Sequence, residues 1–191
     1  FWFVFIALNL FLLGCTQAPL ISSSNTANEV AYEKQIESAT KKIDKYDGFY
    51  QVFQADMTQL SSSVQMSILK RKADFLQWDQ SKLQKERDRA FQEMATEAKF
   101  FLRFYTTESD YDDFHRANSI WKIYLEYNHQ RVEGKAKKMT QKFSDIHQLF
   151  PHFNRFSTGY EVVFPISTSA IEAGEKKVVI TSSLGNASFT F

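Results

Sequence analysis

The sequence predicts an α+β protein that is mainly helical: an antiparallel helical bundle or elongated helical hairpin with a small C-terminal antiparallel β-sheet. Two observations predict this fold class. Apolar residues recur at steps of three and four through most of residues 29–150, which is the spacing of one helix face. After Pro151 they alternate instead, as they do in strands. The length of 191 residues and the 43% content of hydrophobic residues fit one main folded body.

Residues 1–14 are the first element of the chain. The run FWFVFIALNLFLL contains one polar residue, Asn9, and is shorter than the roughly 20 residues that span a bilayer. It has the length of the apolar region of a secretory signal peptide, although neither Met nor a basic residue opens it. We therefore expect a cleaved signal peptide, with a few further residues preceding Phe1.

The run closes with Leu12-Leu13-Gly14-Cys15. This motif resembles the lipobox of bacterial lipoproteins, in which Leu, an aliphatic or small residue, and Gly or Ala precede the Cys. The resemblance implies that Cys15 carries a diacylglycerol and an amino-terminal acyl chain such as palmitate, that residues 1–14 are removed, and that the lipid anchors the mature chain in a membrane. A conventional cleaved signal peptide and a buried helix that contains a cysteine are the alternatives.

Residues 15–28 are expected to be the lipidated cysteine and a flexible tether, because the segment is rich in Ser, Thr and Asn and carries no charge. Thr16, rather than Asp, follows the cysteine. In the enterobacterial form of the sorting rule this resembles an outer-membrane address, and in a Gram-positive cell it would imply the outer face of the plasma membrane. Cys15 is the only cysteine, so no intrachain disulfide can form.

Residues 29–150 are expected to be a helical body. Thr26 and Glu29 fit a capping box at a helix start, and Asp47-Gly48 suits a break. The next helices are predicted by two apolar stripes, namely Phe49, Phe53, Met57, Leu60, Val64 and Ile68, and then Leu83, Ala90, Met94, Ala98, Phe101 and Tyr105. A last helix, from Phe114 to Phe150, is predicted by apolar residues that advance 3.6 positions per step up to Pro151.

Residues 151–191 are expected to form the small β-sheet. Alternating residues predict three strands, near Tyr160 to Ile166, Lys177 to Thr181 and Ala187 to Phe191, with a hairpin turn at Gly185-Asn186. A sheet this small is marginal alone, so we expect its apolar face to pack on the helices. The phenylalanine residues expected to join the two parts are Phe150, Phe153 and Phe156.

Motifs for chemistry are scarce. Two acid-x-x-His spacings, Asp112 with His115 and Glu126 with His129, lie about 21 Å apart on the predicted last helix and cannot share a metal pair. The sequence contains no Gly-x-Ser-x-Gly motif, no phosphate-binding loop and no dinucleotide fingerprint. We therefore expect no metal site, no cofactor and no enzymatic activity.

A basic stripe is the one candidate contact surface. Arg131, Lys135, Lys138 and Lys142 fall at helical spacing beside the apolar stripe of the predicted last helix. Such a stripe could meet anionic lipid headgroups or an acidic envelope protein, although charged stripes of this kind are what exposed helix faces normally carry, and an ordinary solvated face is the alternative. Nucleic acid is disfavoured, because the protein is expected to be exported and its formal net charge is +1.

The sequence thus favours a lipid-anchored lipoprotein of the bacterial cell envelope with a non-enzymatic binding or structural role. Its partners would be the membrane, through the lipid anchor, and an envelope protein or anionic lipid. The alternative is a lipid-anchored envelope hydrolase whose site the sequence motifs do not identify.

Overall fold

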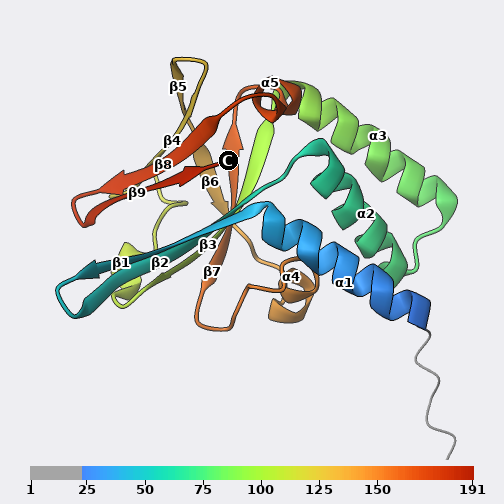
Figure 1. Ribbon diagram of the computed structural model, residues 1–191, viewed down its shortest axis with the longest axis horizontal. Helices are drawn as coiled ribbons and strands as arrows, with labels where there is room; N and C mark the ends of the chain where they lie inside the picture. The colour runs from blue at the N-terminus through green and yellow to red at the C-terminus, as the bar shows by residue number, and fades with distance from the viewer. Residues whose placement is uncertain (1–22) are drawn as a thin grey trace, which may run out of the picture. The chain divides into compact units, whose positions relative to one another are not determined.

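The computed structural model describes residues 23–191 (Figure 1). The chain divides into two compact units, residues 1–31 and residues 32–191. Helix α1 (Ser23–Ser38) begins in the first unit and ends in the second. The second unit contains the sheets and is described by itself below. No helix within residues 23–191 combines the length and the apolar character needed to cross a bilayer.

Sheet A has five strands, and every neighbouring pair is antiparallel. Its strands, in spatial order, are β1 (Thr40–Asp47), β2 (Tyr50–Gln59), β3 (Ala98–Thr106), β7 (Thr158–Phe164) and β6 (Lys135–Lys138). Sheet B has four strands, which are also antiparallel and run in the order β5 (Gln130–Glu133), β4 (Lys122–Tyr127), β8 (Lys176–Ser182) and β9 (Gly185–Thr190).

The two sheets enclose one apolar core. Strand β3 shows how the sequence builds it, since Phe100, Leu102 and Phe104 are fully buried and alternate along the strand. The rings of Phe100 and Phe104 contact aromatic side chains from other segments of the chain. One of these is Trp121, whose ring centroid lies 5.2 Å from that of Phe104. Because Phe101 points to the opposite face, β3 is covered on both sides and reads as a nearly continuous apolar run.

Helices cover the outer face of sheet A. They include α2 (Ser62–Leu76), α3 (Gln80–Thr96) and α4 (Phe143–Leu149), while the short α5 (Thr168–Glu172) precedes β8 and a 3₁₀ turn, η2 (Ser109–Tyr111), follows β3. The hydroxyl of Ser61 caps α2 and the carboxylate of Asp79 caps α3, each accepting a hydrogen bond from a backbone N–H of the first turn. In this second core the ring of Phe101 stacks on that of Phe150 at 3.8 Å.

The predicted fold class, mainly helical with a small C-terminal sheet, is wrong. The described residues hold nine strands in two sheets, and six of these strands lie within the predicted helical body of residues 29–150. The error has a physical cause: a step of four residues returns to the same face of a helix and also to the same face of a strand. Phe53 and Met57 thus share the inner face of β2, and Ala55 between them is buried beside them.

The predicted last helix is also wrong, because residues 122–149 form β4, β5, β6 and α4 instead. Asn128 and His129 have φ angles of 44° and 60° and make the two-residue turn between β4 and β5. Trp121, Ile123 and Leu125 are buried in alternation. The apolar stripe predicted for a helix included Trp121 and Leu125, which are four residues apart, and left out Ile123 between them.

The C-terminal strands were predicted in the right places, but they do not form one small sheet. β7 joins sheet A, whereas β8 and β9 belong to sheet B, and the hairpin between them turns at Ser183-Leu184 rather than at Gly185-Asn186. Phe150 and Phe153 are buried as expected, but Phe156 is 85% exposed. Residues 23–28, expected as part of the tether, belong to α1.

Candidate functional site

A cleft of about 460 Å³ lies between the helix pair α2–α3 and the outer face of sheet A. Its apolar lining comes from α2, α3, β3 and α4 and from residues next to them: Leu60, Ile68, Leu69, Ala90, Phe100, Phe101, Met139, Leu149 and Phe150. The volume falls in the range of small-molecule sites. This cleft is the candidate functional site.

One wall of the cleft carries charged groups that are already paired. Glu86, Arg89 and Glu93 lie on the inward side of α3 because they are spaced at three and four residues. The Lys99 ammonium, on β3, lies 2.5 Å from Glu93 Oε2, and Arg89 Nε donates to Glu93 Oε1 at 2.9 Å. Burial opposes the charge of Glu93, but the bonds from Lys99 and Arg89 outweigh it and lower the pKa of this carboxyl.

Lys72 and Glu161 differ from the other charged groups of the cleft. Within the described part of the chain, neither side chain makes a hydrogen bond or a close ion pair. Burial lowers the pKa of the Lys72 ammonium, and the fields of Glu161 and Glu86 offset this effect only in part. The cleft therefore contains an ammonium group that is half-buried, makes no hydrogen bond to the protein and keeps some contact with water.

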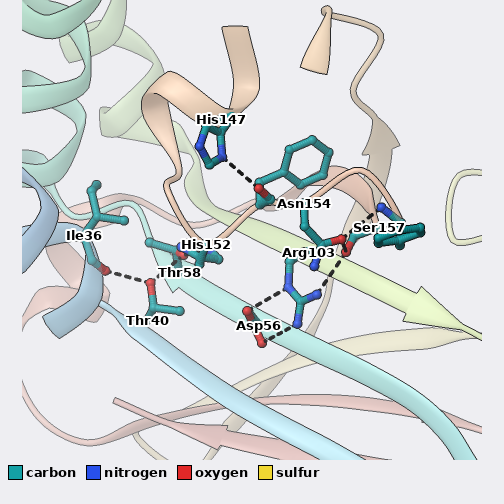
Figure 2. Close-up of polar contacts among 11 residues, drawn as sticks. Ile36, Thr40, Asp56, Thr58, Arg103, His147, His152, Asn154 and Ser157 are labelled. Carbon is teal, nitrogen blue, oxygen red and sulfur yellow. Dashed lines mark hydrogen bonds and ion pairs between the residues drawn. The ribbon is translucent and has the colours of Figure 1, made fainter. Parts of the chain in front are cut away.

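A buried ion pair lies nearby on the same face of sheet A (Figure 2). Asp56 of β2 and Arg103 of β3 are directly opposite in the register, and two bonds of 2.7 and 3.1 Å join guanidinium and carboxylate. Arg103 Nη1 also donates to Ser157 Oγ at 2.9 Å, and Ser157 donates to Asn154 Oδ1 at 2.7 Å. The pair thus holds the loop before β7 against sheet A.

His152 lies beside this pair. Its pKa is lowered to about 4 by burial, with smaller contributions from Lys42 and Arg103, so the imidazole is neutral near pH 7. Nε2 lies 3.4 Å from the Thr58 hydroxyl, which in turn lies 2.8 Å from the Thr40 hydroxyl (Figure 2). A hydroxyl beside a neutral imidazole resembles a nucleophile and base, but Thr58 is fully buried, and no substrate can reach it.

The basic stripe predicted from the sequence is not a helix face. Arg131 lies on β5, with its guanidinium 3.9 Å from the ring centroid of Tyr124, and Lys142 is the N-cap residue of α4. Lys135 and Lys138 lie at the two ends of β6, three residues apart, so they point to opposite faces. Because β6 is an edge strand of sheet A, its lysines suit protection of that edge from pairing with another chain.

The two acid-x-x-His motifs do not form ligand pairs on a helix. The Asp112 carboxylate accepts hydrogen bonds from the hydroxyls of Thr158 and Tyr160, and Glu126, on β4, lies 3.1 Å from the Lys177 ammonium. His129 lies in the β4–β5 turn. Across residues 23–191 no three or more potential ligands gather as a metal site would require. Cys15 and the signal peptide of residues 1–14 lie outside the described residues.

The residues of the cleft were not singled out from the sequence. Lys72 follows Lys70 and Arg71, and such a basic run is typical of a solvated helix face. A signal was nevertheless present: Lys72 follows Val64 and Ile68 at steps of four and therefore continues the buried stripe of α2. A cation on a buried stripe is the sequence feature that could have identified this site.

Comparison of the chain with protein-family models, with curated proteins and with solved structures finds no match. The assignment of a function therefore rests on the residues and their geometry.

Proposed function

We propose that this chain is a lipid-anchored lipoprotein of the bacterial cell envelope that binds a small amphiphile in the cleft beneath α2 and α3. The amphiphile would place an anionic group against Lys72 and an apolar portion against the side chains of α2, β3 and α4. The role is binding and not catalysis. The ammonium of Lys72, which has no hydrogen-bond partner, carries the binding part of this proposal, and the Leu12-Leu13-Gly14-Cys15 motif carries the lipid anchor.

The exposed lining of the cleft is mostly polar, with a smaller apolar part to which Ile68, Leu149 and Phe150 contribute. It therefore suits an amphiphile with a polar anionic group and a short apolar portion, whose burial contributes about 25 cal/mol per Å². Arg89 and Lys99 are already engaged by Glu93, which leaves Lys72 as the cation available for a carboxylate or phosphate. A half-buried ammonium that gains an anionic partner recovers the part of its solvation that folding removed.

Binding can be measured with a dansyl-labelled fatty acid, whose emission rises on entering an apolar site. We expect the full chain to bind this probe and the Lys72→Met variant, which keeps the apolar stem, to bind about tenfold more weakly or worse. Lys70→Met, an exposed lysine on the same helix, is the matched control and should bind as the parent does. Equal affinity of the parent and Lys72→Met would contradict the proposal.

The binding should also depend on pH in a defined direction. Because the pKa of Lys72 lies below that of an ordinary lysine, affinity for the probe should fall as pH rises, at a lower pH than an exposed lysine would give. An affinity that stays constant up to the pKa of a normal lysine would argue against Lys72 as the contact.

The anchor needs a separate experiment in cells. Cys15→Ser should leave the precursor unprocessed and without acyl chains, and detergent partitioning compares this variant with the parent. If the variant remained acylated and membrane-bound, the lipoprotein assignment would be wrong, whereas the cleft would be unaffected. Turnover of ester substrates by the purified chain, abolished by one substitution, would instead favour the alternative of a lipid-anchored hydrolase.

A further inference from the structure

The β1–β2 hairpin ends in three exposed aromatic residues. Phe49 is fully exposed at 103% of its reference area, Tyr50 is exposed at 83% and Tyr46 at 54%. Figure 1 shows the hairpin extending away from the helices, with its turn at the far end. We refer to Tyr46, Phe49 and Tyr50 as the aromatic tip.

The aromatic tip is formed by a tight turn. Asp47 and Tyr50 are paired in the register, so Gly48 and Phe49 make a two-residue loop, and Gly48 supplies the positive φ of 60° that such turns need at this position. Across the strands Gln51 Nε2 donates to the Tyr46 hydroxyl at 3.0 Å. The exposed rings therefore stand on an ordered hairpin.

The aromatic tip also lies beyond the apolar core between the two sheets, against which the rest of the hairpin packs. Ile43 on β1 and Val52 on β2 are the outermost residues of the hairpin that pack against the core between the sheets. Lys45 of β1 lies against the start of β9, since its Cε is 3.2 Å from where a Cβ on Gly185 would lie. Beyond this point the second unit leaves Phe49 and most of Tyr50 uncovered, together with about half of Tyr46.

A protein partner fits this surface poorly. A stable protein interface takes about 800 Å² from each partner and 20 to 30 residues, and three side chains on a hairpin turn offer far less. The strand behind them cannot extend the surface, because β1 is an edge strand bearing Lys41, Lys42 and Asp44, which oppose pairing with another strand.

Insertion of a few side chains into a lipid bilayer does not require an interface as large as that between two proteins. Tyrosine and phenylalanine rings are stabilised singly at the boundary between headgroups and acyl chains, with the ring buried and a phenol hydroxyl still hydrated. Lys45 and Asp47 flank the rings with opposite charges and can remain among the headgroups. Because these two charges cancel, the affinity of the tip for the bilayer should depend mainly on burial of the rings and only weakly on the salt concentration.

We propose that the aromatic tip inserts into the interfacial layer of a lipid bilayer. Phe49 enters deepest, since it lies in the turn itself, and the two tyrosines lie on either side with their hydroxyls toward the headgroups. This contact is separate from the lipid on Cys15 and from the cleft, and it orients the second unit on a membrane surface.

Site-specific fluorescence tests the insertion in the full chain. Phe49→Cys is labelled with an environment-sensitive nitrobenzoxadiazole probe and reconstituted into vesicles of phosphatidylethanolamine and phosphatidylglycerol. Phe156→Cys, at a phenylalanine that is 85% exposed, is the matched control. We expect emission from position 49 to shift to shorter wavelength and to be quenched by nitroxide lipids, while position 156 behaves as in water. Equal, unquenched emission at both positions would overturn the proposal.

Three further measurements separate the alternatives. Adding Tyr46→Ser and Tyr50→Ser to Phe49→Cys should reduce the quenching, and an unchanged signal would contradict a role for the rings. A shift that appears without lipid and grows with protein concentration would identify a second copy of the chain as the occupant and overturn the bilayer contact. The parent treated with the same reagent reports the state of Cys15, so a free thiol there would contradict the anchor without bearing on position 49.

Discussion

The two faces of sheet A are built from different chemistry, although the same strands supply both. The inner face, toward sheet B, presents mostly rings and aliphatic chains that are fully buried, among them Phe53, Met57, Phe100, Leu102, Phe104, Tyr160, Val162 and Phe164. The outer face, toward the helices, carries Asp56, Thr58, Lys99, Arg103 and Glu161 in addition to Phe101. Strand alternation therefore separates the apolar core from most of the charged groups.

The two faces of sheet A therefore stabilise the fold through different interactions. Between the sheets, stability comes from burial and from aromatic pairs, such as Phe53 and Trp121 with centroids 5.3 Å apart. Under the helices, polar groups are buried only where they are paired, and every buried side-chain nitrogen or oxygen that the structure describes has a hydrogen-bond partner. The outer face can therefore hold a ligand cleft without weakening the inner core.

The largest expected effect comes from truncating the inner face. Phe104 is fully buried and its ring contacts those of Phe53, Phe114 and Trp121, so Phe104→Ala should lower the free energy of unfolding by about 4 kcal/mol. Chemical denaturation measures this loss. The exposed Phe156→Ala is the control and should stay within about 0.5 kcal/mol of the parent. A loss of similar size in both variants would remove the distinction between core and surface.

The next effect tests the outer face. Arg103→Met leaves the Asp56 carboxylate buried without its partner, so the free energy of unfolding should fall by about 3 kcal/mol. Adding Asp56→Leu removes the stranded charge, and the double variant should recover most of this loss. If the double variant were as unstable as Arg103→Met, Arg103 would act through its packing and its bond to Ser157 rather than through the ion pair.

The sequence allowed the C-terminal strands to be predicted but not the two sheets. Alternation from Tyr160 to Phe164 has no helical counterpart, because residues two apart lie on opposite sides of a helix. The stripe containing Phe53 and Met57 fits both periods, and the choice between them depends on tertiary packing. In the segment of Trp121 to Leu125, the β-branched and aromatic content was the local signal for a strand.

The candidate site was harder to predict from the sequence than the fold. Its cleft joins α2, α3, α4 and sheet A, which are far apart in the sequence, so no local motif describes it. Asp56 and Arg103 form an ion pair only because the antiparallel register of β2 and β3 places them opposite each other. Register depends on the whole hydrophobic pattern and on the two intervening helices, and charge spacing along the chain carries no information about it.

The smallest of these effects concerns His152 and the pH dependence of the outer face. Its pKa falls from about 6.5 in the unfolded chain to about 4 in the folded protein, so the unfolded chain takes up the proton first as pH falls. Stability is therefore lost as pH drops below about 6.5, by about 2 kcal/mol between pH 7 and pH 5. Chemical denaturation at both pH values measures this loss in the parent.

His152→Asn should lose this part of the pH dependence, because the neutral side chain has no proton to gain. The control is His129→Gln, at an exposed residue of the β4–β5 turn, which should retain the slope of the parent. The carboxylates that titrate in the same range are common to all three proteins and cancel in the comparison. An equal slope in His152→Asn and the parent would show that the acid sensitivity arises elsewhere, and His152 would then contribute only its packing between Phe101 and Phe150.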